Sequence, residues 1–258
     1  QSCSSLTEVK LPDTVTVIDS QAFKGSTALA DINLPASVTT IGSEAFSNCD
    51  SLVSVNMPDS VTSLGANAYY DCTLLEHIHL SEGLTKLQDS TFYNCDALKD
   101  IEIPDSITTI GSSVFYDCDA LVTARIGEGV TTIGSSVFYD CDALTTVTMG
   151  DAVTTMGTHV FYHNDVLESV ELSMQLTSIP QYSFYTCPKL TEIVIPYYVT
   201  TIGDYAFNAS PKLAKVVTRS NLTSIASNAF SYPNVTVFHG DAGSYTETWA
   251  GNNGYSFV

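Results

Sequence analysis

Apolar and polar positions along this chain repeat every 23 residues. In the unit 98–120, Ile101 and Ile103 alternate with polar neighbours, as the residues of a half-buried strand do. A Pro-Asp-Ser turn ends that strand, because proline cannot donate to a sheet ladder. A second apolar pair, Ile107 and Ile110, predicts another short extended segment. Each unit is therefore expected to form two short strands joined by a turn.

The unit closes on an aromatic residue. Gly111 permits a corner, and residues 112–115 predict a capped single helical turn that directs Phe115 into the core. Because each coil exposes an apolar face above and below, the coils are stable only when they stack. The aromatic position recurs without insertion or deletion at Phe23, Phe46, Tyr69, Phe92, Phe115, Phe138, Phe161, Phe184, Phe207 and Phe230.

A period in this range with leucine-like anchor positions is the signature of leucine-rich repeats. We predict an α/β fold, a leucine-rich-repeat solenoid of about ten 23-residue coils. It would have a parallel concave β-sheet, short strands and single helical turns on the convex side, and a C-terminal helical cap. The repeats are expected over about 1–235 and the cap over about 236–258, as a single domain over 1–258. In the cap, residues 244–250 predict a short helix between extended segments, and Trp249, the only tryptophan, is expected to cover the open end of the core.

The cysteines share one position of the repeat, three residues after the aromatic position. A disulfide framework would place cysteines at positions that face one another, whereas equivalent positions all point the same way. Ser26, Asn164 and Ser210 take the same place in other repeats, so it accepts a small polar group. We predict a column of buried thiols, with an occasional bridge between coils as the alternative; a zinc site is disfavoured because no Cys-x-x-Cys pair occurs. The cysteines are Cys3, Cys49, Cys72, Cys95, Cys118, Cys141 and Cys187.

The charge of the chain limits its partners. The 28 acidic and 9 basic residues give a formal net charge of −19. Such a field repels phosphate backbones and anionic lipids, so neither nucleic-acid nor membrane-surface binding is expected. No apolar run approaches the roughly 18 residues of a transmembrane helix, and no signal peptide is recognised within these residues.

The repeat sequence is specific enough to suggest a family. The run LPASVTTIGSEAFSNC, residues 34–49, resembles the BspA-type, or Treponema pallidum-type, leucine-rich repeats, and residues 243–258 resemble the helical cap that often ends such arrays. The resemblance implies a secreted or cell-surface adhesin of a host-associated anaerobe, without cofactor and expected to be monomeric. It implies as partners host extracellular-matrix or surface proteins, glycans or neighbouring microbes. An anaerobic habitat would also keep exported thiols reduced.

The outward positions of the longer strands offer candidate binding residues. His77 and His79 lie two residues apart on one face, and the next coil is expected to place Asp100 and Glu102 beside them. Arg125 follows on the same face. Two imidazoles and two carboxylates can hold a divalent ion, which would permit a metal-dependent hydrolase. The alternative is a cross-strand charge ladder, and nucleophilic catalysis is disfavoured because no serine or cysteine completes a triad.

Two further surfaces are candidates for contact with a partner. Near the C-terminal end, Val194 and Val217 replace polar residues on the concave face and Tyr197-Tyr198 replaces the usual Asp-Ser turn, so an apolar contact patch is predicted there. On the convex side a tyrosine follows the aromatic position in consecutive repeats, and we interpret this ladder either as packing or as a contact surface. Its members are Tyr70, Tyr93, Tyr116, Tyr139, Tyr162 and Tyr185.

Taken together, these features predict a non-enzymatic binding protein that uses its concave face and C-terminal apolar patch. The alternative is a structural spacer, a rigid rod of about 50 Å at roughly 4.8 Å per coil, that displays another domain.

Overall fold

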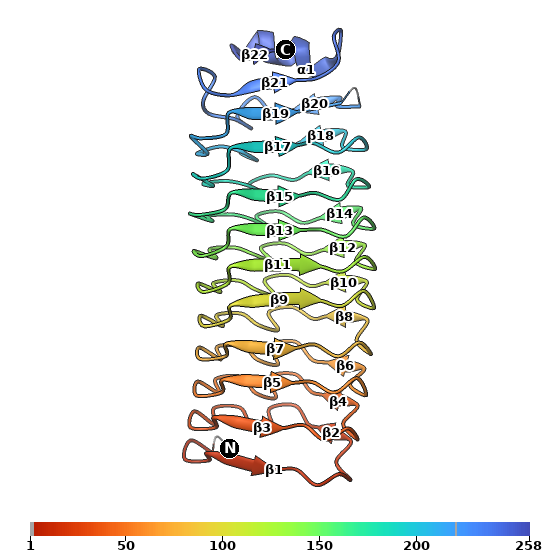
Figure 1. Ribbon diagram of the computed structural model, residues 1–258, viewed down its shortest axis with the longest axis vertical. Helices are drawn as coiled ribbons and strands as arrows, with labels where there is room; N and C mark the ends of the chain where they lie inside the picture. The colour runs from red at the N-terminus through yellow and green to blue at the C-terminus, as the bar shows by residue number, and fades with distance from the viewer. Residues whose placement is uncertain (1–2, 220) are drawn as a thin grey trace.

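The computed structural model describes residues 3–219 and 221–258 and shows a column of stacked coils. Figure 1 shows the longer strands lying one above another on one side of the column, and we call this side, predicted to be concave, the strand face. Each coil places one longer strand on this face and a two-residue strand on another side of the coil. The strands of the strand face are β1 (Glu8–Lys10), β3 (Asp31–Asn33), β5 (Ser54–Asn56), β7 (His77–His79), β9 (Asp100–Ile103), β11 (Thr123–Ile126), β13 (Thr146–Thr148), β15 (Ser169–Glu171), β17 (Glu192–Val194), β19 (Lys215–Val217) and β21 (Val237–His239). The two-residue strands are β2 (Val17–Ile18), β4 (Thr40–Ile41), β6 (Ser63–Leu64), β8 (Lys86–Leu87), β10 (Thr109–Ile110), β12 (Thr132–Ile133), β14 (Thr155–Met156), β16 (Ser178–Ile179), β18 (Thr201–Ile202) and β20 (Ser224–Ile225).

The repeat period sets the register of the sheets. Paired strands run parallel, and residues one repeat apart lie opposite each other, as Ala124 does to Ile101 and Val147. Along each strand the central residue is directed inward and its neighbours outward, so that Ile32 is buried between exposed Asp31 and Asn33. This alternation confirms the predicted half-buried strands and positions the outward residues as a continuous surface.

The aromatic position forms the centre of the core. The rings stack on one another from Phe23 to Phe230, with centroids 5.0 to 5.7 Å apart and planes within 20° of parallel. The rings from Phe46 to Phe207 are almost completely inaccessible to solvent. Each ring thereby covers the apolar faces of the coils on both sides, which a single coil cannot do.

The segment before each aromatic residue differs from the predicted helical turn. Ser113 and Asp117, on either side of Phe115, have φ of 54° and 59°, and the equivalent residues of other coils have the same left-handed conformation. A left-handed residue cannot continue a right-handed helix, so the segment forms successive tight turns. The N–H of Phe115 donates to the carbonyl of Val137 in the next coil at 2.9 Å. The turns therefore link neighbouring coils as the strands do.

The thiol column is confirmed for the six cysteines from Cys49 to Cys187, which are buried and unbridged. The thiol of Cys118 donates to the carbonyl of Phe92, 3.3 Å away in the preceding coil, and the other five make the equivalent contact. Asn164 and Ser210 reproduce it with an amide and a hydroxyl, at 2.8 and 3.1 Å. The position therefore selects a small donor because each coil has one inward carbonyl to satisfy.

Both columns of strands are interrupted at two levels. The strand face is paired from β1 to β7, from β9 to β15, and from β17 to β21, and the shorter strands are interrupted between β6 and β8 and between β14 and β16. In Figure 1, β7 and β9, like β15 and β17, lie farther apart than the strands next to them. The coil before each opening has Ser81 or Ser173 where the following coil has Pro104 or Pro196. Each serine hydroxyl donates to a carbonyl of the preceding coil and accepts from the N–H two residues later, which ties its turn to the preceding coil.

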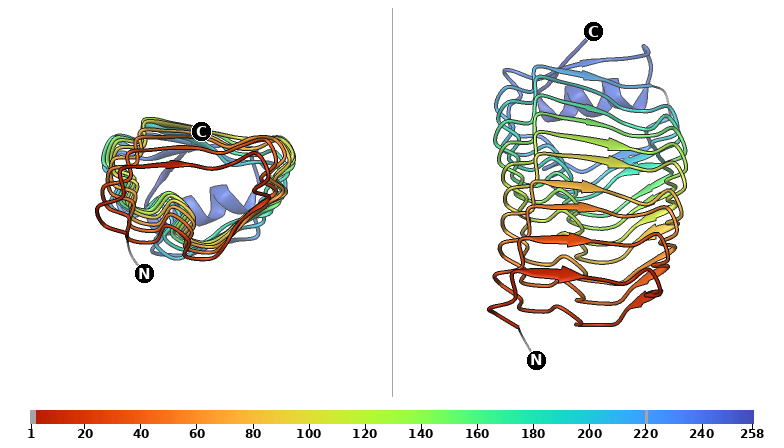
Figure 2. Two further views of the ribbon diagram at one scale, coloured as in Figure 1. Left: turned by 90° about the horizontal axis from the view of Figure 1, so that it is seen from below. Right: turned by 60° about the horizontal axis from the view of Figure 1, so that its bottom comes forward.

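The C-terminal cap is confirmed. Helix α1 (Tyr245–Asn253) begins at Ser244, whose side chain accepts from Glu247 N, and ends at Gly254, whose φ is 79°. Strand β22 (Ser256–Phe257) then pairs with β21. Figure 2 shows α1 lying across the outline of the coils at this end. Trp249 is 6% exposed and meets Phe238 edge-on at 5.6 Å, so it closes the end of the core as predicted.

Candidate functional site

The histidine and acidic residues predicted to form one cluster lie on two separate sheets. Strand β7, with His77 and His79, pairs with β5, whereas β9, with Asp100 and Glu102, pairs with β11. No register pairing joins β7 to β9 among the described residues. The predicted side-by-side ladder of these four residues is therefore wrong, because the sheet opens between their strands.

His77, Glu102 and Arg125 on this part of the strand face each lie near an ionisable partner. His77 Nε2 lies 4.0 Å from the carboxylate of Glu76. The guanidinium of Arg125 lies 3.3 Å from Glu102 and 3.5 Å from Asp105. Within residues 3–219 and 221–258, no group of three or more His, Cys, Asp or Glu is arranged to hold a metal ion. The geometry thus favours pairs of charges and gives no support to the metal site or to the hydrolase that depended on it.

Three of the predicted residues nevertheless come together. Asp100, Glu102 and Arg125 line a shallow depression of about 320 Å³ over β9, β11 and β13, together with the outward threonines of β13. The depression is open, and its one cation is already paired with two carboxylates. It offers both hydrogen-bonding groups and some apolar surface from Ile101 and Ala124.

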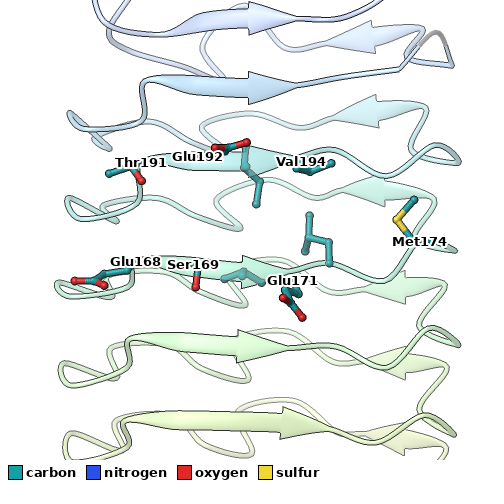
Figure 3. A pocket seen from close by; sticks show the side chains of 10 residues that line it. Glu168, Ser169, Glu171, Met174, Thr191, Glu192 and Val194 are labelled. Carbon is teal, nitrogen blue, oxygen red and sulfur yellow. The ribbon is translucent and has the colours of Figure 1, made fainter.

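A second depression lies where the sheet opens between β15 and β17, and we call it the β15/β17 groove. Its volume is about 410 Å³, within the range of ligand-binding clefts. Figure 3 shows Glu168 and Glu171 along the lower strand of the opening, Glu192 and Val194 along the upper strand, and Met174 at one end. The floor consists of aliphatic side chains that a closed sheet would cover.

The predicted apolar patch continues from this groove. Val194 lines the groove and lies opposite Val217 in the β17–β19 register. Val194, Tyr197 and Tyr198 are 44%, 46% and 50% exposed, and the two tyrosine rings meet edge-to-face at 5.2 Å. Large apolar side chains so exposed at one end of a strand face form a surface suited to contact with a partner.

The convex tyrosines are packed on one another. From Tyr70 to Tyr185 the ring centroids are 4.5 to 5.0 Å apart and the planes are within 15° of parallel. The rings are half-buried, and each inner ring has neighbours over both faces. The packing interpretation is therefore confirmed. As a contact surface the ladder offers ring edges and hydroxyl groups, because its ring faces are covered.

An acidic column runs beside the tyrosines. The pKa shift is clearest for Asp119. Burial, together with the neighbouring carboxylates of Asp117 and Asp142, raises the pKa of its carboxyl group to about 6. The pKa values of Asp117 and Asp142 are also raised, with burial as the first cause and nearby aspartates as the next. The column is a set of like charges that repel one another at neutral pH.

Sequence reasoning missed the groove. It identified Val194 but not Glu168, Glu171 or Met174, because an unbroken repeat predicts an unbroken sheet. The available signal was the serine at position 173, in the turn where most other coils have proline or glycine.

Comparison with known proteins identifies the relatives of this chain. The model of the BspA type leucine rich repeat region matches residues 1–122 and 108–236. A leucine rich cell surface protein from Faecalibacterium prausnitzii A2-165 is 30% identical, with 96% of this chain and 76% of that chain covered and a TM-score of 0.54. The T. pallidum leucine rich repeat protein is 28% identical over 76% of this chain and 82% of its own, with the same TM-score.

The pneumococcal vaccine antigen PcpA shares the fold at 17% identity, with 98% and 78% coverage and a TM-score of 0.54. A search of curated proteins gave no match. No helix among the described residues has the length and apolar character needed to cross a bilayer. With a family model that covers most of its length and with coils of the same build, this chain belongs to the BspA-type leucine-rich repeat family.

Proposed function

We propose that this chain is a secreted or cell-surface binding protein, adhesin-like and without enzymatic activity, that recognises a host or microbial protein or glycan through its strand face and C-terminal apolar patch. One observation carries the proposal: Val194, Tyr197 and Tyr198 are about half exposed and lie together, at positions where most of the preceding coils have polar residues. Family membership supports a protein-interaction role at the cell surface, and one relative is described as a cell surface protein.

The buried thiols are compatible with export. Burial raises the pKa of Cys49 and of Cys187 to about 12, so the reactive thiolate is scarce at neutral pH. Each thiol also donates to a backbone carbonyl of the preceding coil and is shielded from oxidants. This protection does not depend on an anaerobic habitat, although a host-associated anaerobe remains part of the proposal.

An array of host matrix proteins, microbial surface proteins and glycans tests the proposed function. The purified domain is compared with a Tyr197→Asp/Val217→Asp variant at physiological salt. The matched control, Ser63→Asp/Thr155→Asp, adds the same charge on the two-residue strands β6 and β14, away from the strand face and the patch. A signal that the patch variant loses and the control retains is the expected result.

Equal loss in both variants would show that added charge, not the patch, abolishes binding. If the unmodified domain binds nothing on the array, the result would instead favour the structural spacer, because a spacer needs no ligand of its own. Both variants must unfold at the temperature of the unmodified protein for the comparison to count.

A further inference from the structure

The β15/β17 groove combines apolar and acidic surface with no lysine or arginine among its lining residues, whereas the depression at β1 and β3, which also has carboxylates beside aliphatic side chains, includes Lys10. The floor of the β15/β17 groove includes Val170, which is buried, and Leu172, which is half-buried, and its end is formed by Met174, which is 46% exposed. Leu172 is half-buried, whereas the equivalent Ile126 and Met149 of paired strands are buried, so the opening leaves part of the floor accessible beside charged side chains. Met174 lies at a turn position that is exposed in the neighbouring coils as well, and here it adds an apolar side chain to the rim.

The carboxylates at the groove differ in whether they are neutralised. Glu192 is held by Lys215, whose Nζ lies 2.6 Å from its Oε1. Glu168 and Glu171, both exposed, form no ion pair with any residue that the structure describes. Two uncompensated negative charges therefore border an aliphatic floor, in a chain whose net charge is already −19.

This combination selects the chemistry of an occupant. A phosphate or an acidic segment is repelled by the carboxylates. Neutral sugars can donate hydroxyl groups to Glu168 and Glu171 but leave both charges uncompensated, and no lining residue of the groove offers an aromatic face on which a sugar ring can stack. Lysine and arginine side chains fit, because each carries an aliphatic stem that lies on apolar surface and a cation that remains at the rim.

We propose that the β15/β17 groove binds an extended segment of a partner protein in which a lysine or arginine lies next to an apolar residue. The cation pairs with Glu168 or Glu171, its stem covers the aliphatic floor, and the adjacent apolar side chain rests on Val194 and Val217. The inference rests on the proposed function and names its partner as a protein segment. The acidic field of the whole chain would also accelerate association with such a segment.

The test uses a library of fluorescent octapeptides in which lysine or arginine alternates with leucine or valine at the central positions. A second library has serine at each basic position. Binding is measured by fluorescence anisotropy at 50 and 300 mM salt. We expect the basic library to bind, with weaker binding at high salt, and the serine library to bind at least tenfold more weakly.

Paired variants locate the site. Glu168→Gln/Glu171→Gln removes two charges from the groove and is expected to reduce peptide affinity about tenfold. The control Asp19→Asn/Asp204→Asn removes two exposed charges away from the strand face and is expected to change affinity less than twofold. Failure of every basic peptide to bind, or an equal loss in groove and control variants, would overturn the inference.

The outcome separates this inference from the proposed function. An array ligand that is lost in Tyr197→Asp/Val217→Asp but retained in Glu168→Gln/Glu171→Gln would leave the protein a binding module and refute the groove as the site of a basic segment. Loss of the same ligand in both of these variants, with the control unchanged, supports both proposals.

Discussion

Replacing Tyr69 by phenylalanine should stabilise this protein. Tyr69 occupies the aromatic position, which is phenylalanine in all the remaining repeats from Phe23 to Phe230. Its side chain is completely buried. Its ring stacks between Phe46 at 5.2 Å and Phe92 at 5.5 Å, but its hydroxyl has no hydrogen-bond partner among the described residues. The same burial raises the pKa of the phenol well above its ordinary value.

The magnitude follows from the unsatisfied hydroxyl. A buried polar group without a partner costs about 1–3 kcal/mol relative to a bonded one. Removing the oxygen leaves a void of roughly 10–15 Å³, which costs about 0.3 kcal/mol. Because the ring contacts are kept, Tyr69→Phe is expected to raise the free energy of unfolding by about 1–2.5 kcal/mol. At about 2–4 °C per kcal/mol, the melting temperature should rise by roughly 2–10 °C.

Thermal and urea unfolding, followed by far-UV circular dichroism, would measure the change. The reciprocal variant Phe92→Tyr introduces a hydroxyl one coil away and should lower stability. A decrease in stability for Tyr69→Phe would refute the reasoning, since it would mean that the hydroxyl is bonded in solution, for example to a buried water. No change in either variant would show that the aromatic column accommodates a hydroxyl without cost.

Three other predictions concern charge, the cap and the thiols. The raised pKa of Asp119 means that the folded state binds its proton more tightly than the unfolded chain, so this group's stabilisation is lost as the pH rises from about 4 to about 6. Asp119→Asn should therefore raise the free energy of unfolding at pH 7, by at most about 1 kcal/mol because the side chain is largely exposed, and have no effect below pH 4, which urea unfolding at the two pH values would measure; an equal effect at both pH values would contradict this origin. Trp249→Ala should cost about 3–5 kcal/mol and unfold the C-terminal coils first, which hydrogen exchange of β19 and β21 would detect; uniform loss of protection would argue against a local cap. The six buried thiols should resist a thiol reagent at pH 8 until urea unfolds the chain, and rapid labelling of Cys118 in the native protein, seen by mass spectrometry, would contradict the buried column.

The features that follow from the 23-residue period could be predicted because identical coils must place identical side chains one above another. The aromatic column and the thiol column follow from the recurrence of one position every 23 residues, and the alternation of Ile101 and Ile103 with polar neighbours is visible within one coil. The cap was predictable for a similar reason. A stack ends in an open apolar face, and Trp249 lies in the one segment that leaves the repeat pattern.

The binding residues were only partly predictable. The apolar patch at Val194, Tyr197 and Tyr198 could be identified because its residues depart from the repeat and all lie at one end. The cluster of His77 and Asp100 could not be judged correctly, because it assumed that adjacent coils always pair.

The sequence by itself determined which residues stack in columns, since that depends only on a constant repeat length and on burial of apolar faces. Tertiary structure alone decided where the sheet opens and which carboxylates stay uncompensated beside the opening. The physical reason is that pairing between coils depends on small shifts of the backbone. The hydroxyl of Ser173 ties its turn to the coil before it, but the hydroxyls of Ser37 and Ser60 do the same where the sheet stays paired, so such a bond does not by itself predict an opening.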